Sequence, residues 1–486
     1  MARQSISRIF TSLAEADPHR VVAVFDGEQR TELTALELDR DSNRLARAYL
    51  ALGVTRDSFV TVALPNSLEM VVVCVAIWKC GATPQPVSTG LDVAERAEIE
   101  ALVGPALVVG VRSSSPEVPW VPLGWSTAPE VLALPDGVLP DAWSTHWKAP
   151  TSSGSTGRPK VVLAAAPALL DPDRAVAPYL PRDQVQLVAG PLTHSATFTY
   201  AFRGLMTGHR LVILPRFDER AVLAAIAEHR VTWALLVPTM LHRLLRVPAE
   251  VRAAADLSSL ATVLHLGAPC PPDVKRRFMK WVGAESVVEV YVGSESNGIV
   301  MIRGDEWLAH PGSVGRPSGA TTVSIRAPDG ADLPTGATGT IWMRRAGDPT
   351  YTYLGGDSAR TTDGWDTIGD LGFLDADGYL FVVDRADDVI LRGGVNVHPA
   401  EVERIVEQHP AVRSAVAFGV PDDDLGARIE VVADVAGASV TADELVAWCR
   451  SRLDGGRRPA AVHVVSEPVR NDAGKVRRAE YRVRFS

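Results

Sequence analysis

Strand-like and helix-like segments alternate along the first two thirds of the chain. A short β-rich run at 59–64 precedes an apolar helix that ends at Gly81, and strand-like runs at 233–237, 262–266 and 287–292 are separated by helical spacing. Strands that alternate with helices are typical of parallel sheets with helices on both faces. The sequence therefore predicts an α/β fold with doubly wound sheets.

The composition and the secondary-structure pattern of the sequence change twice after this region. Residues 312–383 are rich in Gly, Asp, Thr and short β runs, which predicts a smaller β-rich subdomain. From 387 onward, two helices and two strands are followed by a basic tail, the pattern of a compact α+β unit. We therefore predict a large N-terminal domain over 1–386 and a small C-terminal domain over 387–486.

Charge and composition exclude several classes of protein. The net charge of −9 argues against a general nucleic-acid binder. The four cysteines form no CxxC pair, so a disulfide framework or a zinc site is not expected. The longest apolar run, Met70–Trp78, is about half a membrane span, and the N-terminus lacks an apolar signal core. We expect a cytoplasmic protein with no membrane span.

Lysine is rare in this chain. Only six of the 49 basic residues are Lys, and two of them, Lys160 and Lys475, lie in Gly-containing loops. Lysine offers a compact charge where Arg offers a planar fork, so the two are not interchangeable at a tight site. Each lysine is therefore a candidate for a specific role.

The stretch TSSGSTGRPK, residues 151–160, is the first candidate binding loop. A Walker loop requires Gly-Lys-Ser/Thr leading into a helix, but here Gly157 is followed by Arg-Pro-Lys and then by an apolar run. Free backbone N–H groups and hydroxyls can nevertheless hold a phosphate. From its own residues the stretch is either a phosphate-binding loop or a linker.

Five further motifs occur in a fixed order after this loop. They are PLTH (191–194), YVGSE (291–295), TIGDLG (367–372), the run from 384 to 403, and NDAGKVRR (471–478). Together with the loop they resemble the core motifs of the adenylate-forming superfamily, in its acyl- and aryl-CoA ligase branch. The resemblance implies a mobile C-terminal domain, ATP, Mg²⁺ and coenzyme A. It also implies a two-step reaction that first makes an acyl-adenylate and then an acyl-CoA.

The resemblance assigns nucleotide binding to residues from several motifs. Binding of the β- and γ-phosphates is assigned to Thr151, Ser152, Ser155, Thr156 and Lys160. Adenine binding is assigned to the backbone of Gly267, Ala268 and Pro269, and ribose binding to Asp370 and Arg385. Tyr291 and Ser294, in the YVGSE motif, are further cofactor-binding candidates. Taken singly, these residues are also explained as solvated loop or turn residues.

The resemblance also assigns the chemistry. Glu295 is expected to bind Mg²⁺, and Lys475 to bridge the substrate carboxylate and the α-phosphate. His194 matches a residue that gates access of the acid, although a lone His is more often a satisfied core residue. Asp387 matches the hinge of the C-terminal domain. Gly393 and Gly394 match a loop that approaches the thiol channel in the second step.

Four positions depart from the family pattern: Val161, Ser294, Ile368 and Asp384. None removes a charge that the chemistry requires. Asp384 adds a negative charge near the nucleotide, which leaves open an enzyme with a poor first step.

The sequence indicates the kind of acid more weakly. His194 stands where amino-acid-activating relatives carry an Asp, and the surrounding residues are small or apolar. An uncharged fatty, alicyclic or aromatic tail is therefore favoured. The net charge of +5 over 451–486 fits the phosphates of coenzyme A, an acidic carrier protein or a solvated face. A carrier-protein-loading enzyme, a non-catalytic adenylate-binding protein and a homodimer remain alternatives.

Overall fold

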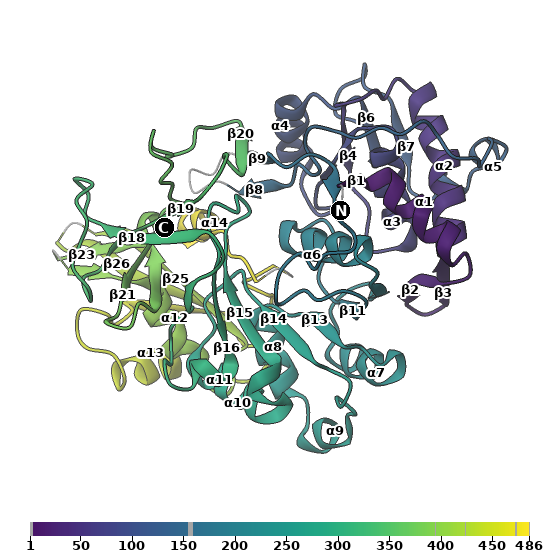
Figure 1. The fold of residues 1–486 in the computed structure, drawn as a ribbon. Helices are drawn as coiled ribbons and strands as arrows, with labels where there is room; N and C mark the ends of the chain where they lie inside the picture. Colours follow the sequence, from purple (N-terminus) through teal and green to yellow (C-terminus); the bar gives the residue numbers. More distant parts are fainter. Residues whose placement is uncertain (1–2, 154–158, 394, 423, 472–473, 486) are drawn as a thin grey trace.

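A nine-stranded sheet forms the centre of the large domain in the computed structural model, which describes residues 3–153, 159–393, 395–422, 424–471 and 474–485 (Figure 1). Its strand order is β17-β16-β15-β14-β13-β11-β12-β2-β3. The six strands from β15 to β2 are parallel, and the edges are antiparallel. The strands span Arg316–Pro317, Val300–Arg303, Val287–Tyr291, Thr262–His265, Trp233–Leu235, Val185–Val188, Arg210–Ile213, Val21–Asp26 and Arg30–Thr34, in that order.

Helices cover both faces of this sheet. One face packs against α7 (Glu219–His229), α8 (Pro238–Arg246) and α10 (Pro272–Val282) in one apolar cluster. The other face packs against a second cluster, formed by α1 (Ile6–Ala16), α2 (Ala35–Ala51), α3 (Leu68–Lys79) and α6 (Ser195–Met206). Burial on both faces explains the continuous apolar runs of the strands. The predicted doubly wound α/β fold is confirmed.

Two smaller sheets lie beside this core. A parallel sheet of order β5-β4-β6-β7 contains Thr83–Pro86, Phe59–Val62, Leu107–Gly110 and Trp120–Pro122. A three-stranded sheet of order β20-β9-β8 contains Tyr351–Leu354, Pro159–Ala164 and Thr151–Ser153. The second sheet fixes both ends of the loop at 151–160, because β8 and β9 are its two arms.

The predicted β-rich subdomain is an antiparallel sheet of order β18-β19-β21-β22. Its strands are Thr321–Arg326, Gly339–Arg345, Asp370–Leu374 and Leu380–Arg385. A short turn, η3 (Ala386–Asp388), then leads to the C-terminal residues. The predicted domain division at 386 falls in this turn and stays a prediction.

The C-terminal residues form a separate α+β layer. A hairpin of β23 (Ile390–Arg392) and β24 (Val395–Val397) precedes a sheet of order β25-β26-β27. The sheet strands are Ser414–Asp422, Gly426–Asp434 and Ala461–Val465, and the helices are α12 (Pro399–Glu407), α13 (Ala442–Arg450) and α14 (Arg478–Phe485). The basic tail of the sequence thus contains a strand and a helix.

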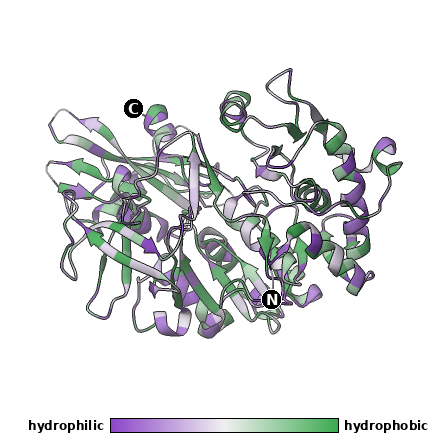
Figure 2. Ribbon diagram, turned by 45° about the horizontal axis from the view of Figure 1, so that its top comes forward, coloured by the Kyte–Doolittle hydropathy of each residue, from purple (hydrophilic) through white to green (hydrophobic). Residues whose placement is uncertain are grey.

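Hydropathy follows this architecture. In Figure 2 the strands of the large sheet are mostly hydrophobic, whereas hydrophilic residues gather on outer helix faces and turns. Within the described residues, no helix has both the length and the apolarity needed to cross a membrane.

Candidate active site

A cavity of about 2380 Å³ opens at the carboxyl ends of the parallel strands β14 and β15. Its lining includes Leu266 and Tyr291 from the ends of these strands, and Lys475 and Glu403 from the C-terminal residues. Ligands of open α/β sheets bind at this edge of the sheet. The cavity is therefore the candidate active site.

Asp370 is the centre of one wall of the cavity. Tyr291 Oη donates a hydrogen bond of 2.7 Å to Asp370 Oδ2, and Arg385 Nε lies 3.2 Å from Asp370 Oδ1. The register of β21 and β22 places Asp370 opposite Arg385. Burial raises the pKa of Asp370, whereas Arg385 and Tyr291 act against this rise. The structure thus brings together Asp370 and Arg385, which were predicted to lie beside the ribose, with Tyr291, which was predicted to bind the cofactor.

Glu295 lies on a second wall and is held by the sheet that carries the predicted phosphate loop. Tyr353 Oη donates to Glu295 Oε1 at 2.6 Å, and Lys160 Nζ lies 5.3 Å from the centre of the Tyr353 ring. Burial and the negative charge of Glu295 raise the pKa of Tyr353, so the phenol stays a donor. Tyr353 was not predicted from the sequence, because only the pairing of β20 with β9 brings it here.

The donors around Glu295 fit a magnesium ion bound together with phosphates. Magnesium keeps several waters and takes one or two carboxylates together with phosphate oxygens. Glu295 is a buried carboxylate, and Lys160 lies behind it against the Tyr353 ring, although Lys160 is not among the described residues that line the cavity. The assignment of Glu295 to the metal stays a prediction.

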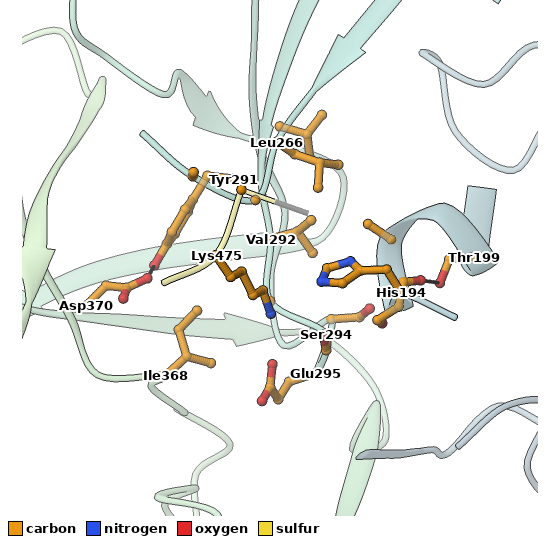
Figure 3. A pocket seen from close by; sticks show the side chains of 18 of the residues that line it. His194, Thr199, Leu266, Tyr291, Val292, Ser294, Glu295, Ile368, Asp370 and Lys475 are labelled. Carbon is orange, nitrogen blue, oxygen red and sulfur yellow. Dashed lines mark hydrogen bonds between the residues drawn. The ribbon is translucent and has the colours of Figure 1, made fainter. Parts of the chain in front are cut away.

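Lys475 enters the cavity on a tight turn. Asn471 Oδ1 accepts the Lys475 backbone N–H at 2.9 Å, and Asn471 N–H donates to Lys475 O at 2.9 Å. Gly474 has φ of +74°, and a Cβ there would lie 3.3 Å from Thr239 Oγ1, so glycine suits this turn. In Figure 3 the Lys475 ammonium lies between Glu295 and the His194 ring.

The electrostatics of Lys475 and His194 follow from this proximity. Burial lowers the pKa of Lys475, Arg385 acts in the same direction, and Glu295 opposes them. Burial together with Lys475 and Lys148 lowers the pKa of His194 to about 3. His194 is therefore neutral at pH 7, and it precedes the first residue of α6.

The remaining predicted residues are less closely grouped. Gly267, Ala268, Pro269, Ser294 and Asp387 line the cavity. Thr151 lies in β8, where its hydroxyl accepts a hydrogen bond of 3.0 Å from Gln85, and Ser152 is paired with Lys160. Gly393 forms the turn of the β23–β24 hairpin and is not among the described residues that line the cavity. Ser155, Thr156 and Gly394 lie outside the described residues.

Two cations of the cavity were not assigned from the sequence. Lys148 Nζ donates to Thr199 Oγ1 at 2.6 Å and to Ser195 Oγ at 3.3 Å. The Arg203 guanidinium lies 4.1 Å from the centre of the Trp147 ring. The rarity of lysine was the one sequence signal that singled out Lys148, and nothing in the motifs indicated Arg203.

Comparison with known proteins places the chain in a family. The family model of AMP-binding enzymes matches residues 10–348, and that of the AMP-binding enzyme C-terminal domain matches residues 401–475. The chain is 32% identical to a feruloyl-CoA synthase of Amycolatopsis sp, over 97% of each chain. It is 30% identical to the 2-succinylbenzoate–CoA ligase of Bacillus licheniformis, over 96% of this chain and 97% of the ligase.

A solved structure supports the same assignment. The o-succinylbenzoate CoA synthetase of Bacillus subtilis, in complex with its acyl-adenylate intermediate, superposes with a TM-score of 0.81. It is 26% identical, and the match covers 99% of this chain and 98% of that one. The chain belongs to the AMP-binding enzymes, which confirms the adenylate-forming superfamily predicted from the motifs. The predicted enzyme class, an AMP-forming acid–thiol ligase, is confirmed with it.

Proposed function

We propose that this enzyme activates a carboxylic acid with ATP and transfers the acyl group to coenzyme A. The observation that carries the proposal is the position of Lys475: a lysine of the C-terminal residues lies in the cavity lined by Glu295 and Asp370. The named activities of the similar proteins, CoA synthases and CoA ligases, support the same reaction.

The chemistry of the first step explains why a buried lysine is needed. A carboxylate oxygen forms a bond to the α-phosphorus of ATP, and pyrophosphate leaves. The two reacting groups are both anionic, so a fixed cation between them stabilises the transition state. Lys475 would lie between the two, and Lys160 would bind the phosphates that leave. Magnesium, held by Glu295, would offset the charge that develops on the phosphate oxygens.

The second step needs a thiol in place of pyrophosphate. The thiol sulfur bonds to the acyl carbon, AMP leaves, and the proton of the thiol is released. Neutral His194 lies beside Lys475 at the start of α6 and would shape the passage between the nucleotide and the acyl group. The small or apolar residues Ala196, Leu266 and Val292 line the cavity and support an acid with an apolar body.

The first test is the exchange of labelled pyrophosphate into ATP across a panel of aliphatic, alicyclic and aromatic acids. We expect exchange that depends on the acid, and AMP release that depends on coenzyme A. The Lys475→Met variant should lose exchange and keep thioester formation from preformed acyl-AMP. Equal loss of both half-reactions would contradict the role of Lys475.

The acceptor thiol is tested separately. Transfer to a carrier protein but not to free coenzyme A would favour the carrier-loading alternative. ATP binding without exchange for any acid would favour a non-catalytic adenylate-binding protein. A homodimer and a cytoplasmic location stay predictions.

A further inference from the structure

Two cations gather around Trp147 on the α6 side of the cavity. The side chain of Lys148 approaches the Trp147 ring at 5.3 Å and that of Arg203 at 4.1 Å, and all three residues line the cavity. Lys148 is only 6% exposed. Within the described part of the chain, neither cation forms an ion pair with a carboxylate, and the two hydrogen bonds of Lys148 go to neutral hydroxyls.

Such an arrangement is costly without an anion. Burying a charge is unfavourable unless it is paired, and two like charges near one another add to the cost. The pKa of Lys148 is lowered to about 7 by burial and by Arg203, and that of Arg203 to about 10 by burial and by Arg3. Glu295 is the carboxylate that acts on Lys148 from within the cavity, but it is hydrogen-bonded to Tyr353. The two cations therefore lack a dedicated counter-charge.

We propose that the acid substrate carries a second anionic group, which Lys148 and Arg203 bind while the first carboxylate reacts beside Lys475. The inference rests on the proposed function and specifies its substrate class. It revises the expectation of a wholly uncharged tail: the apolar body of the acid ends in a carboxylate or a comparable anion.

The helix gives the spacing of the two anionic groups. Thr199 and Arg203 follow His194 by five and nine residues, which corresponds to about 7.5 and about 13.5 Å along the axis of α6. The Lys148 ammonium is hydrogen-bonded to the hydroxyls of Ser195 and Thr199, so an anion that it binds would lie beside this part of α6. The second anionic group is thus expected about one and a half to two and a half helical turns from the reacting carboxylate.

A phosphate of coenzyme A is the other anion of similar chemistry. When its thiol is at the reacting carbonyl, however, the whole pantetheine arm separates the thiol from its phosphates. Lys148 is hydrogen-bonded to Ser195 and Thr199, in the first turn and a half of α6, so it lies only a helical turn or two from His194 and not a pantetheine length away. The acid is therefore the better occupant.

The experiment compares matched acids in the pyrophosphate exchange assay, with ATP saturating and coenzyme A absent. The probes are the α,ω-dicarboxylic acids of six to ten carbons, the monocarboxylic acids of equal length, and phenylalkanoic acids with and without a ring carboxylate. We expect the wild type to favour the doubly charged member of at least one pair by about tenfold or more in kcat/KM, since charge-assisted hydrogen bonds are strong.

Two variants test the residues themselves. Lys148→Met and Arg203→Met should each reduce that preference about tenfold by weakening the diacid alone. Lys280→Met is the matched control, because Lys280 is exposed on α10 and does not line the cavity. Thermal melts of all variants separate loss of fold from loss of recognition.

Three results would overturn the inference. Equal kcat/KM for both members of every pair would show that the tail charge is not recognised. If Lys148→Met lowered kcat/KM equally for all acids and raised the KM for ATP, the lysine would be assigned to nucleotide binding. In the complete ligase reaction with coenzyme A varied, a change confined to the KM for coenzyme A would assign the cations to its phosphates.

Failure of the proposed function gives a different result, namely no exchange with any acid. In that case calorimetric titration of the diacids and monoacids against wild type and Lys148→Met still decides the inference. Tighter binding of a diacid that is lost in Lys148→Met would support it, and equal binding would refute it.

Discussion

Asp384 replaces an uncharged residue of the family pattern, yet its charge is already used within the protein. One carboxylate oxygen accepts the N–H of Arg385 at 2.8 Å, and the other accepts the N–H of Ala400 at 3.2 Å. Ala400 is in the first turn of α12, where unpaired N–H groups favour an anion. Asp384 thus stabilises the start of α12. The two N–H donors offset its negative charge, so this charge is not expected to repel the phosphates of ATP.

These hydrogen bonds predict that Asp384 contributes to the stability of the fold and not to ATP binding. Asp384→Ala should lower the free energy of unfolding by about 1 kcal/mol, as the loss of a helix cap does. The KM for ATP should stay at the wild-type value. Thermal or urea unfolding and ATP kinetics check the two parts, with exposed Asp377→Ala as the control. A clear fall in the KM for ATP would instead restore the sequence-based concern about a poor first step.

At the level of single residues, the motifs predicted the charged side chains of the site that lie within them. Glu295, Asp370 and Lys475 were found because each lies in a recognisable motif, and the structure places all three in one cavity. Tyr353 and Arg203 were missed because nothing local distinguishes them. Their positions depend on strand pairing and on the face of α6, which a single sequence does not show.

Among the secondary-structure elements, α12 carries a buried network of charged side chains. Glu403 accepts hydrogen bonds from Arg470 at 2.8 Å and from Arg478 at 2.7 Å, and also from the backbone N–H of Ala417. Burial acts to raise the pKa of Glu403, but Arg470 and Arg478 outweigh it, so the pKa is lowered. This buried carboxylate connects α12, β25 and the chain around α14.

Loss of that carboxylate should destabilise the C-terminal layer in a pH-dependent way. Glu403→Gln removes the carboxylate that Arg470 and Arg478 share, while Arg478 keeps Asp388 and Arg470 keeps Glu407. The variant should therefore cost about 1.5–3 kcal/mol at pH 7, as the loss of a hydrogen bond to a charged group does. Because the folded pKa lies below the unfolded value, the stabilisation is complete above about pH 4.5 and is lost as the pH falls through the folded pKa. Urea unfolding at several pH values measures it.

The control for this prediction lies on the same helix. Glu401 pairs with Arg457 at 2.8 Å, but both side chains are about two-fifths exposed. Glu401→Gln should therefore cost less than about 1 kcal/mol. Equal costs for the two variants would contradict the role of burial.

Most elements of the fold were predictable and some were not. The parallel strands were found because apolar runs bounded by helices are distinctive. The strand β27 and the helix α14 were read as a basic tail, because the arginines of α14 hide its periodicity and β27 is only five residues long. Here pairing with β26 and packing on β25 decide the structure.

At the scale of the whole molecule, few polar contacts join the C-terminal residues to the large domain within the described parts of the chain. Arg477 donates to both carboxylate oxygens of Glu95 on α4 (Val93–Val103), at 2.8 and 3.1 Å. Arg246, at the end of α8, donates to the carbonyl oxygens of Val412 and Pro410. Both contacts are present in the arrangement of the two parts that puts Lys475 in the cavity.

The Arg477–Glu95 pair should favour the first half-reaction. Glu95→Gln removes a partly exposed ion pair worth less than about 1 kcal/mol, so pyrophosphate exchange should fall up to about fivefold. Thioester formation from preformed acyl-AMP should not fall. Glu228→Gln, which breaks an exposed pair with Arg30 elsewhere, should alter neither. A parallel fall of both half-reactions in Glu95→Gln would contradict this selectivity.

Asp387 should affect the opposite half-reaction if it is the hinge. It is exposed in the turn η3, between the β-rich subdomain and the C-terminal residues. Asp387→Pro fixes φ and should hold this turn in one conformation. We expect exchange to continue and thioester formation to be lost, as measured with preformed acyl-AMP. Normal rates for both half-reactions would place the hinge elsewhere.

The strand β20 has a practical consequence for any shortened form of this enzyme. It pairs with β9 along the edge opposite β8, although almost two hundred residues separate the two strands in sequence. A chain cut near residue 348, where the first family match ends, would lose β20 and leave β9 with a bare edge. Exposed strand edges recruit other chains, so we expect such a fragment to aggregate, whereas one that extends beyond Leu354 keeps this edge covered.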